Sequence, residues 1–251
     1  MNDLETFFAQ HKGRLIHKWL HYFEIYDRHF ARFRGQPVNV LEFGVSQGGS
    51  LQLWRHYFGP QAALFGVDIN PNCRQFEEPG TRIFIGDQED RNFLRTLART
   101  LPTIDILIDD GGHTMRQQIH TLEEFLPRLA PNGVYLIEDL HTSYWRLWGG
   151  GFRRRGTFIE YSKRMIDDLN AWHSQEPRRL AVSNFTKSTH SMHYYDSVLV
   201  IERRPMIEPS HQRVGEALFP DYEPQFPGLI QRLKRRLKRA RGVSPDKQSG
   251  R

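Results

Sequence analysis

The hydrophobic and polar positions predict a short helical region followed by alternating strands and helices. Apolar and aromatic residues between Leu4 and Phe33 recur at roughly helical spacing, with a break near Gly13, which predicts two helices. Gly35 and Pro37 then end the helical pattern. The run VNVLEF follows, and its nearly continuous hydrophobicity is typical of a buried parallel strand.

After this run the pattern alternates regularly. Further strands are predicted at ALFGVDI, RIFIGD, IDILIDD and GVYLIEDL, and helices at SLQLWRHYF, RNFLRTLART and MRQQIHTLEEFLPRLA. A helix from Phe158 to Trp172 and a final strand pair, LAVSNF and YYDSVLVIERR, complete the prediction. The expected fold class is α/β: a Rossmann-like, doubly wound, mostly parallel seven-stranded sheet with helices on both faces. Ligands of such sheets bind beyond the carboxyl ends of the strands.

Three parts are predicted along the 251 residues: an N-terminal helical extension (1–34), an α/β domain (35–205), and a Pro-containing linker with a basic C-terminal tail (206–251). From Gly228 onward the tail has nine Lys or Arg residues and one Asp, so it accounts for more than the whole net charge of +6. The rest of the chain is slightly acidic, and no nucleic-acid partner is expected for it.

Within the tail, apolar residues fall on one helical stripe: Leu229, Ile230, Leu233 and Leu237. A basic amphipathic helix of this kind can contact a polyanion or a membrane surface, although the composition favours a solvated terminal helix or a disordered tail. No apolar run approaches the roughly 20 residues that span a bilayer, and the first residues lack a signal-peptide pattern, so a cytoplasmic location is expected. A homo-oligomer, most simply a dimer, would bury the apolar faces of the N-terminal helices.

A glycine-rich loop follows the first predicted strand. Gly44 and Gly48 allow a tight turn that brings backbone amides and a helix N-terminus against a ligand. Ser46 stands where a dinucleotide fingerprint has its middle glycine, which disfavours nicotinamide cofactors. Glu42 near the strand end suits a ligand with an ammonium group, such as the amino-acid end of S-adenosylmethionine, and Ser50 completes the predicted cofactor loop.

Two further strand ends carry acidic residues that suit the same ligand. Asp68 closes the second strand and is expected to hold ribose hydroxyls. Asp87, together with Gln88, follows the third strand and is expected to reach the adenine amino group. Helix capping explains any one of these aspartates equally well, but the set favours S-adenosylmethionine.

The fourth and fifth strands end in the carboxylates Asp109, Asp110, Glu138 and Asp139. Four carboxylates at neighbouring strand ends would repel one another, and a hard divalent cation with oxygen ligands removes this cost, which favours Mg²⁺. His113 lies in the loop after the fourth strand and is a candidate general base for a sugar or phenol hydroxyl. A surface or capping histidine is the alternative.

The motif EDLHTSYW contains candidate substrate-binding residues. His141 suits a contact to the acceptor or a hydrogen bond to a metal ligand. Tyr144 and Trp145 resemble an aromatic lid that stacks on sugar rings, although core packing explains them almost as well.

Together these motifs resemble the macrocin and mycinamicin sugar O-methyltransferases. The resemblance rests on LEFGVSQGGSLQLW, GDQED, IDDGGH, PNGVYLIEDLHTSYW and MHYYDSVLVIER, and it covers roughly residues 38–204. It implies that the α/β domain is a class I S-adenosylmethionine-dependent methyltransferase domain that acts on a saccharide hydroxyl of a glycosylated natural product or polysaccharide. It also implies Mg²⁺ bound by Asp110, Glu138 and Asp139, His113 as the base, and a cofactor or structural role for Asp109.

Two other functions stay open at this point. A phenolic or catechol-like acceptor would use the same chemistry, because vicinal oxygens there also chelate a metal. A non-catalytic assembly protein that only binds the cofactor is the second alternative. Methylation of nucleic-acid amines is disfavoured, since the fourth strand ends in DDGGH and not in an NPPY-like motif.

Overall fold

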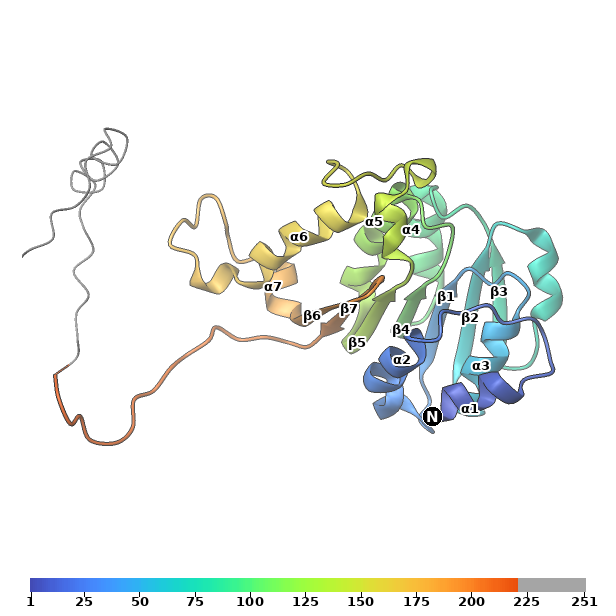
Figure 1. The fold of residues 1–251 in the computed structure, drawn as a ribbon, viewed down its shortest axis with the longest axis horizontal. Helices are drawn as coiled ribbons and strands as arrows, with labels where there is room; N and C mark the ends of the chain where they lie inside the picture. Colours follow the sequence, from blue (N-terminus) through green and yellow to red (C-terminus); the bar gives the residue numbers. More distant parts are fainter. Residues whose placement is uncertain (221–251) are drawn as a thin grey trace, which may run out of the picture. The chain divides into compact units, whose positions relative to one another are not determined.

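A seven-stranded sheet runs through the computed structural model, which describes residues 1–220 (Figure 1). The strands are β1 (Asn39–Phe43), β2 (Ala63–Asp68), β3 (Thr81–Ile85), β4 (Ile104–Asp109), β5 (Leu129–Ile137), β6 (Thr189–Tyr195) and β7 (Val198–Arg203). Their order in the sheet is β3-β2-β1-β4-β5-β7-β6. Strands β1 to β5 pair in parallel, while β7 is antiparallel to both β5 and β6. The predicted α/β class with a mostly parallel sheet is confirmed.

Helices cover both faces of this sheet (Figure 1). They are α1 (Asp3–Gln10), α2 (Tyr22–Phe30), α3 (Gly49–Phe58), α4 (Arg91–Thr100), α5 (Met115–Phe125), α6 (Phe158–Leu169) and α7 (Asn184–Ser188). Successive side chains of a strand point to opposite faces, so Leu41 packs in the core with α4, α5 and α6, whereas Val40 packs with α1, α2 and α3. The continuous hydrophobicity of the strands is explained by this burial on both sides.

The register of the central strands places three loops at one edge. Phe43 at the end of β1 pairs with Asp109 at the end of β4, and Asp109 pairs with Ile137 at the end of β5. The loops that leave these strands therefore begin side by side. All the predicted acidic and glycine motifs lie at this edge.

The N-terminal region contains two helices, as predicted, but the part between them is different. Residues 11–21, here called the N-terminal strap, are not helical, although their apolar spacing resembles that of a helix. The strap crosses directly over the start of α3, where a Cβ atom on Gly49 would lie 2.3 Å from the carbonyl oxygen of Leu15. The Arg14 amide also donates a hydrogen bond to Gln52 of α3 (2.8 Å). Packing against the sheet edge replaces the predicted helical turns.

The predicted strand LAVSNF is wrong. Ser183 caps a short helix there by a reciprocal pair of hydrogen bonds with Thr186, and α7 begins at Asn184. The predicted strand YYDSVLVIERR is also two strands, because the chain turns at Ser197 with φ of 62° and enters β7 one residue later. The last two strands thus form a hairpin closer to the C-terminus than expected.

Residues Met1–Pro209 form one compact unit, and a second unit begins at Ser210. Helix α1 packs on α2 and α3, and the apolar faces of α1 and α2 are buried in the core of the chain, which removes the reason given above for burying them in a dimer. Most of the predicted linker and tail (206–251), including the basic amphipathic stripe at Leu229, lies outside the described residues. Within residues 1–220, no helix combines the length and the hydrophobicity that crossing a membrane requires.

Candidate active site

A cavity of about 270 Å³ lies at the carboxyl edge of β1, β4 and β5. The glycine loop after β1 forms one wall, and the loops after β4 and β5 form another. Residues Leu15–Trp19 of the N-terminal strap close a third side. The predicted cofactor loop and the predicted acidic cluster therefore share one cavity.

The glycine loop can approach β4 only because it lacks side chains there. Gly44 has φ of 92°, and a Cβ atom on it would lie 1.8 Å from the carbonyl oxygen of Asp110. Gly48 has φ of 74° and precedes the first turn of α3, whose free amide groups face the loop. The Ser46 amide donates to the Asp68 carboxylate (2.9 Å), so this predicted ribose ligand lies against the loop.

Glu42 lies beneath the loop. Its carboxylate is 1% exposed and accepts hydrogen bonds from Ser50 Oγ (2.7 Å) and Trp54 Nε1 (2.9 Å). Burial raises the pKa of Glu42 to about 7. Both oxygens thus have internal partners, and the structure gives Glu42 a supporting position under the loop.

Gln88 and Asp109 also form a buried network. Gln88 Nε2 donates to Asp109 (2.6 Å), and its Oε1 accepts from the Gly112 amide (3.2 Å). The Tyr135 hydroxyl donates to the other oxygen of Asp109, and burial raises the pKa of Asp109 to about 7. These contacts hold the loop after β4, whereas the predicted adenine ligand Asp87 is exposed.

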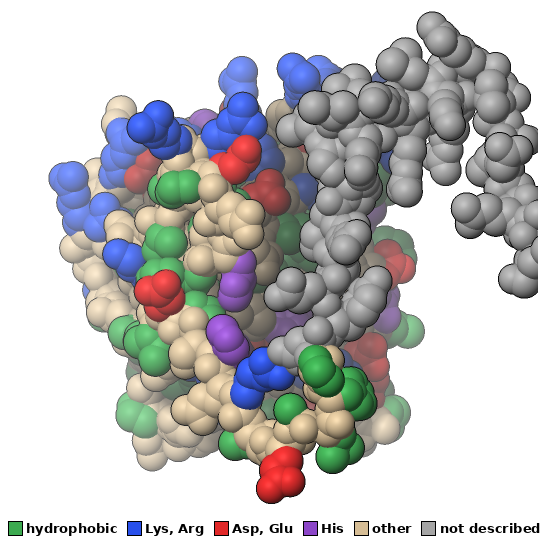
Figure 2. All heavy atoms as spheres, turned by 90° about the vertical axis from the view of Figure 1, so that its left-hand side faces the viewer, with side chains coloured by type: hydrophobic (Ala, Val, Ile, Leu, Met, Phe, Trp, Pro, Cys, Tyr) green, Lys and Arg blue, Asp and Glu red, His purple; other side chains and the backbone are tan. Residues whose placement is uncertain are grey.

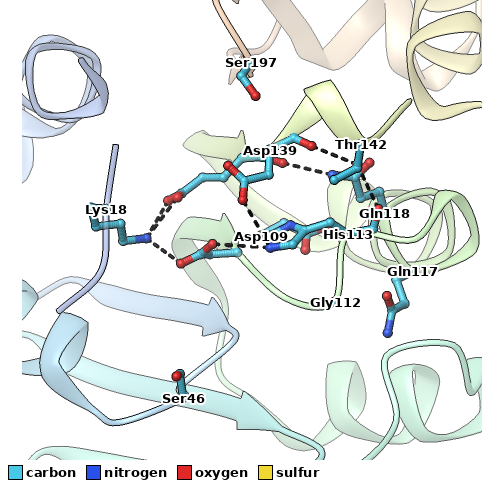
Figure 3. Close-up of polar contacts among 12 residues, drawn as sticks. Lys18, Ser46, Asp109, Gly112, His113, Gln117, Gln118, Asp139, Thr142 and Ser197 are labelled. Atoms are coloured by element: carbon cyan, nitrogen blue, oxygen red, sulfur yellow. Dashed lines mark hydrogen bonds and ion pairs between the residues drawn. The ribbon is translucent and has the colours of Figure 1, made fainter. Parts of the chain in front are cut away.

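His113 faces two of the predicted carboxylates (Figure 3). Its Nε2 lies 3.7 Å from Asp110 Oδ1 and 3.5 Å from Asp139 Oδ2. His113 and Asp139 both have φ of 56°, a left-handed conformation that is uncommon for residues other than glycine. Such strain persists where the surroundings enforce it, often at functional sites. The structure therefore brings the predicted base and two predicted metal ligands together.

The donor set suits a hard cation. Three potential ligand atoms, one from each of Asp110, His113 and Asp139, lie within 4.8 Å of one another. Carboxylate oxygens dominate this set, as Mg²⁺ requires, and a thiol that would favour zinc is not among its members. The third predicted ligand, Glu138, is 1% exposed and is turned toward a lysine. The residues present fit a magnesium ion at Asp110 and Asp139, while Glu138 has another partner in this structure.

That partner is Lys18, which sequence reasoning missed. Its Nζ lies 2.6 Å from Asp110 Oδ2 and 2.9 and 3.0 Å from the two oxygens of Glu138, and its side chain is 3% exposed. Lys18 belongs to the N-terminal strap and reaches the carboxylates from the side opposite His113 (Figure 3). The only sequence signal for Lys18 was the excess of acidic residues after β4 and β5. It predicted a positively charged partner, but it did not indicate a lysine from a distant segment.

Two tyrosines of α2 complete the acidic cluster. Tyr26 donates a hydrogen bond to Glu138 Oε1 (2.7 Å), and Tyr22 donates to Asp139 Oδ1 (2.8 Å). These hydrogen bonds from α2 hold the Glu138 and Asp139 carboxylates in their orientations. Helix α2 is thus part of the architecture of the site.

The environment of His113 favours a neutral imidazole. Burial lowers the pKa of His113 below 6.5, although Asp110 and Asp139 act in the opposite direction. Its Nδ1 is buried and has no hydrogen-bond partner among the described residues. A neutral ring has one nitrogen free to accept a proton.

Two of the predicted substrate residues, His141 and Tyr144, line a neighbouring groove of about 460 Å³. His141 hydrogen-bonds Ser197 Oγ (2.5 Å), lies 4.0 Å from Asp139, and packs its ring on Trp145. Tyr144 and Trp145 are 51% and 46% exposed, so they are not core residues. Figure 2 shows Lys and Arg side chains along the upper edge of one face and histidines in its middle, with apolar side chains between them.

Comparisons with known proteins show the family to which this chain belongs. Residues 41–140 match a family model described as a methyltransferase domain. The chain is 35% identical over 199 residues to the 8-demethyl-8-alpha-L-rhamnosyl tetracenomycin-C 2'-O-methyltransferase of Streptomyces olivaceus, covering 74% of this chain and 52% of the relative. It is 33% identical over 196 residues to the mycinamicin VI 2''-O-methyltransferase of Micromonospora griseorubida, covering 74% and 49%.

A solved structure, the MycE methyltransferase of the mycinamycin pathway in complex with Mg and SAH, is 31% identical with a TM-score of 0.71. The match covers 81% of this chain and 54% of that one. The chain spans about half the length of the relatives that it matches. It therefore carries a methyltransferase domain and is a homologue of the sugar O-methyltransferases of the tetracenomycin and mycinamicin pathways.

Proposed function

We propose that this chain transfers a methyl group from S-adenosylmethionine to a hydroxyl of a saccharide, with Mg²⁺ at the acidic cluster and His113 as general base. The observation that carries the proposal is the approach of His113 Nε2 to Asp110 and Asp139 beside the glycine loop. The names of the similar proteins, which are sugar O-methyltransferases, favour a saccharide acceptor.

The glycine loop is the proposed donor site. Gly44 and Gly48 let the backbone approach the ligand, and Asp68 is held against the loop by the Ser46 amide. Asp68 would bind the ribose hydroxyls, and the exposed Asp87 would reach the adenine. S-adenosylmethionine bound here supplies an electrophilic methyl group. Glu42, Ser50, Gln88 and Asp109 would maintain the shape of the site through their buried hydrogen bonds.

The proposed magnesium ligands are Asp110, Glu138 and Asp139. Mg²⁺ at this position would orient the acceptor oxygen and lower the pKa of its hydroxyl. Tyr22 and Tyr26 hold two of these carboxylates by hydrogen bonds, so their orientation does not depend on the ion alone. Such support typically preserves ligand geometry.

His113 is the proposed catalytic residue. Its neutral Nε2 accepts the proton that the acceptor hydroxyl loses as the new oxygen–methyl bond forms. Asp110 and Asp139, at 3.7 and 3.5 Å, then stabilise the imidazolium that results. The remaining contribution of the protein is alignment of the acceptor with the methyl group.

The groove beside the site is the proposed acceptor region. His141 and Tyr144 line it, and Trp145 packs on His141 at its border. Aromatic faces stack well on sugar rings and on apolar aglycones. The groove therefore offers room for the part of the acceptor that does not react.

An acceptor panel tests the proposal. The chain is incubated with S-adenosylmethionine, Mg²⁺ and either glycosides or catechols, and the products are examined by mass spectrometry. The expected result is one added methyl group on a glycoside. Methylation of catechols alone would establish the phenolic alternative, and cofactor binding without transfer to any acceptor would establish the assembly-protein alternative.

We also propose a homodimer and a cytoplasmic location. Exposed apolar residues in the loop after β5, Leu147 and Phe152, support a contact between copies. A mass by light scattering near twice 29.6 kDa is the expected result. A mass of 29.6 kDa would contradict the dimer.

A further inference from the structure

Lys18 occupies an unusual position for a lysine. Its ammonium lies within 3.0 Å of three carboxylate oxygens that belong to Asp110 and Glu138, and its side chain is 3% exposed. Both residues are proposed magnesium ligands. Lysines are almost never buried unless they are paired, so the pairing with these two carboxylates is what holds Lys18 there.

A divalent cation and this ammonium would compete for the same oxygens. A metal bound by Asp110 and Glu138 would lie within a few ångströms of Lys18 Nζ. Two positive charges at so short a distance in a buried site repel each other strongly. The lone pairs that Glu138 directs at Lys18 are also those that it would donate to the metal as the third ligand. Binding of one cation therefore disfavours the other.

The N-terminal strap is built so that Lys18 can leave. Tyr22 begins α2 directly after it, and Arg14 is fixed to α3 through Gln52. Between these points, Trp19 is 52% exposed and Leu20 is 68% exposed. Besides the Lys18 ion pairs, movement of this part away from the cavity would break the edge contact between the Trp19 and His141 rings (5.9 Å), while Ile16, two residues earlier, stays packed against the core.

We propose that Lys18 and the divalent cation bind the Asp110–Glu138 pair in turn, so that the N-terminal strap closes on the site without metal and opens when metal binds. The inference rests on the magnesium site of the proposed function. Lys18 is accordingly a positioning residue: in the absence of the ion it keeps the ligand carboxylates together and offsets part of their negative charge. It does not touch the acceptor.

Metal affinity tests this directly, without an activity readout. Mn²⁺ binding is measured by electron paramagnetic resonance for the wild type, for Lys18→Met and for Lys12→Met, a variant that removes an exposed lysine of the same strap. Removal of the competitor should tighten Mn²⁺ binding about tenfold or more in Lys18→Met. Lys12→Met should bind like the wild type.

The result that overturns the inference is an unchanged or weaker Mn²⁺ affinity in Lys18→Met while the wild type still binds Mn²⁺. Absence of Mn²⁺ binding in all three proteins would overturn both the inference and the proposed metal site. Methyl transfer to glycosides is a separate observation, so failure of the proposed function is distinguished from failure of this inference.

A second measurement uses only the wild type and does not depend on the folding of a variant. Trypsin cleaves after lysine, and it needs the side chain to be accessible. Mg²⁺ should accelerate cleavage after Lys18 several-fold and leave cleavage after the exposed Lys12 unchanged, because opening raises the accessible population. A cleavage rate after Lys18 that Mg²⁺ leaves unchanged or lowers would overturn the proposal.

Discussion

His113 combines a strained backbone with a buried ring. It has a left-handed conformation, and its Nε2 faces Asp110 and Asp139. Burial lowers the pKa of His113 from its usual value of 6.5, which favours the neutral imidazole. The residue is thus prepared to accept a proton.

Substitution of His113 tests its role as base. His113→Asn keeps a polar side chain of similar size but cannot take up the proton, so kcat should fall by about 10²–10⁴. In the wild type the rate should decline on the acid side, at a lower pH than the usual histidine pKa would give, because protonation of His113 removes the free base. His113→Asn should lack this acid limb. Retention of full kcat in the variant would assign the proton to another group.

At the residue scale the sequence predicted several of the side chains that meet in the cavity, but not every partner. The DDGGH and EDLH motifs indicated His113 and the acidic cluster because charged residues follow two buried strands. Lys18 was not identifiable, since its contacts to Asp110 and Glu138 join residues about 90 to 120 positions apart. The same holds for Tyr22 and Tyr26, whose hydroxyls reach the site from a helix predicted only from its apolar spacing.

The glycine loop shows how an element depends on one small residue. The turn after β1 passes so close to the loop after β4 that Gly44 has no room for a methyl group. Asp110, whose carbonyl fills that space, is also a proposed metal ligand. The proposed donor side and the proposed acceptor side of the site are therefore in direct backbone contact.

Gly44→Ala should be strongly destabilising. The added Cβ would lie 1.8 Å from the Asp110 carbonyl oxygen and would also require a positive φ from alanine, so the free energy of unfolding should fall by at least about 2 kcal/mol. Gly35→Ala is the matched control, because Gly35 has φ of 67° with nothing within 4 Å of an added Cβ. Its cost should be roughly 1 kcal/mol. Equal losses in urea unfolding would show that the close approach is unimportant.

At the element scale, burial decides what could be predicted. Strands β1, β2 and β4 were predictable because they are buried on both faces and therefore largely hydrophobic. The N-terminal strap was not, since Leu15, Ile16 and Trp19 imitate helical spacing while they face the sheet edge or solvent. The segment LAVSNF was misassigned because the capping residue Ser183 starts a helix within an apolar run.

The whole molecule couples ligand binding to folding through the sheet edge. The donor loop, the acidic cluster and the strap all line one cavity, so a ligand there contacts elements from distant parts of the chain. A ligand that binds only the folded state stabilises it by mass action.

S-adenosylhomocysteine should therefore stabilise the chain. At a concentration 100 times its Kd, the free energy of unfolding should rise by about 2.7 kcal/mol. Urea denaturation with and without the ligand measures this, and adenosine diphosphate serves as the control for nonspecific nucleotide binding. A stabilisation by adenosine diphosphate but not by S-adenosylhomocysteine would contradict the cofactor assignment.

Magnesium dependence tests the central claim, that the acidic cluster acts together with His113 at a saccharide hydroxyl. The measurement is the initial rate of methyl transfer to a glycoside, with Mg²⁺, with excess EDTA, and with EDTA followed by excess Mg²⁺. Loss of the metal should lower the rate by about 10² or more, since a bound cation contributes several kcal/mol, and Mg²⁺ should restore it. A full rate in excess EDTA would contradict the account.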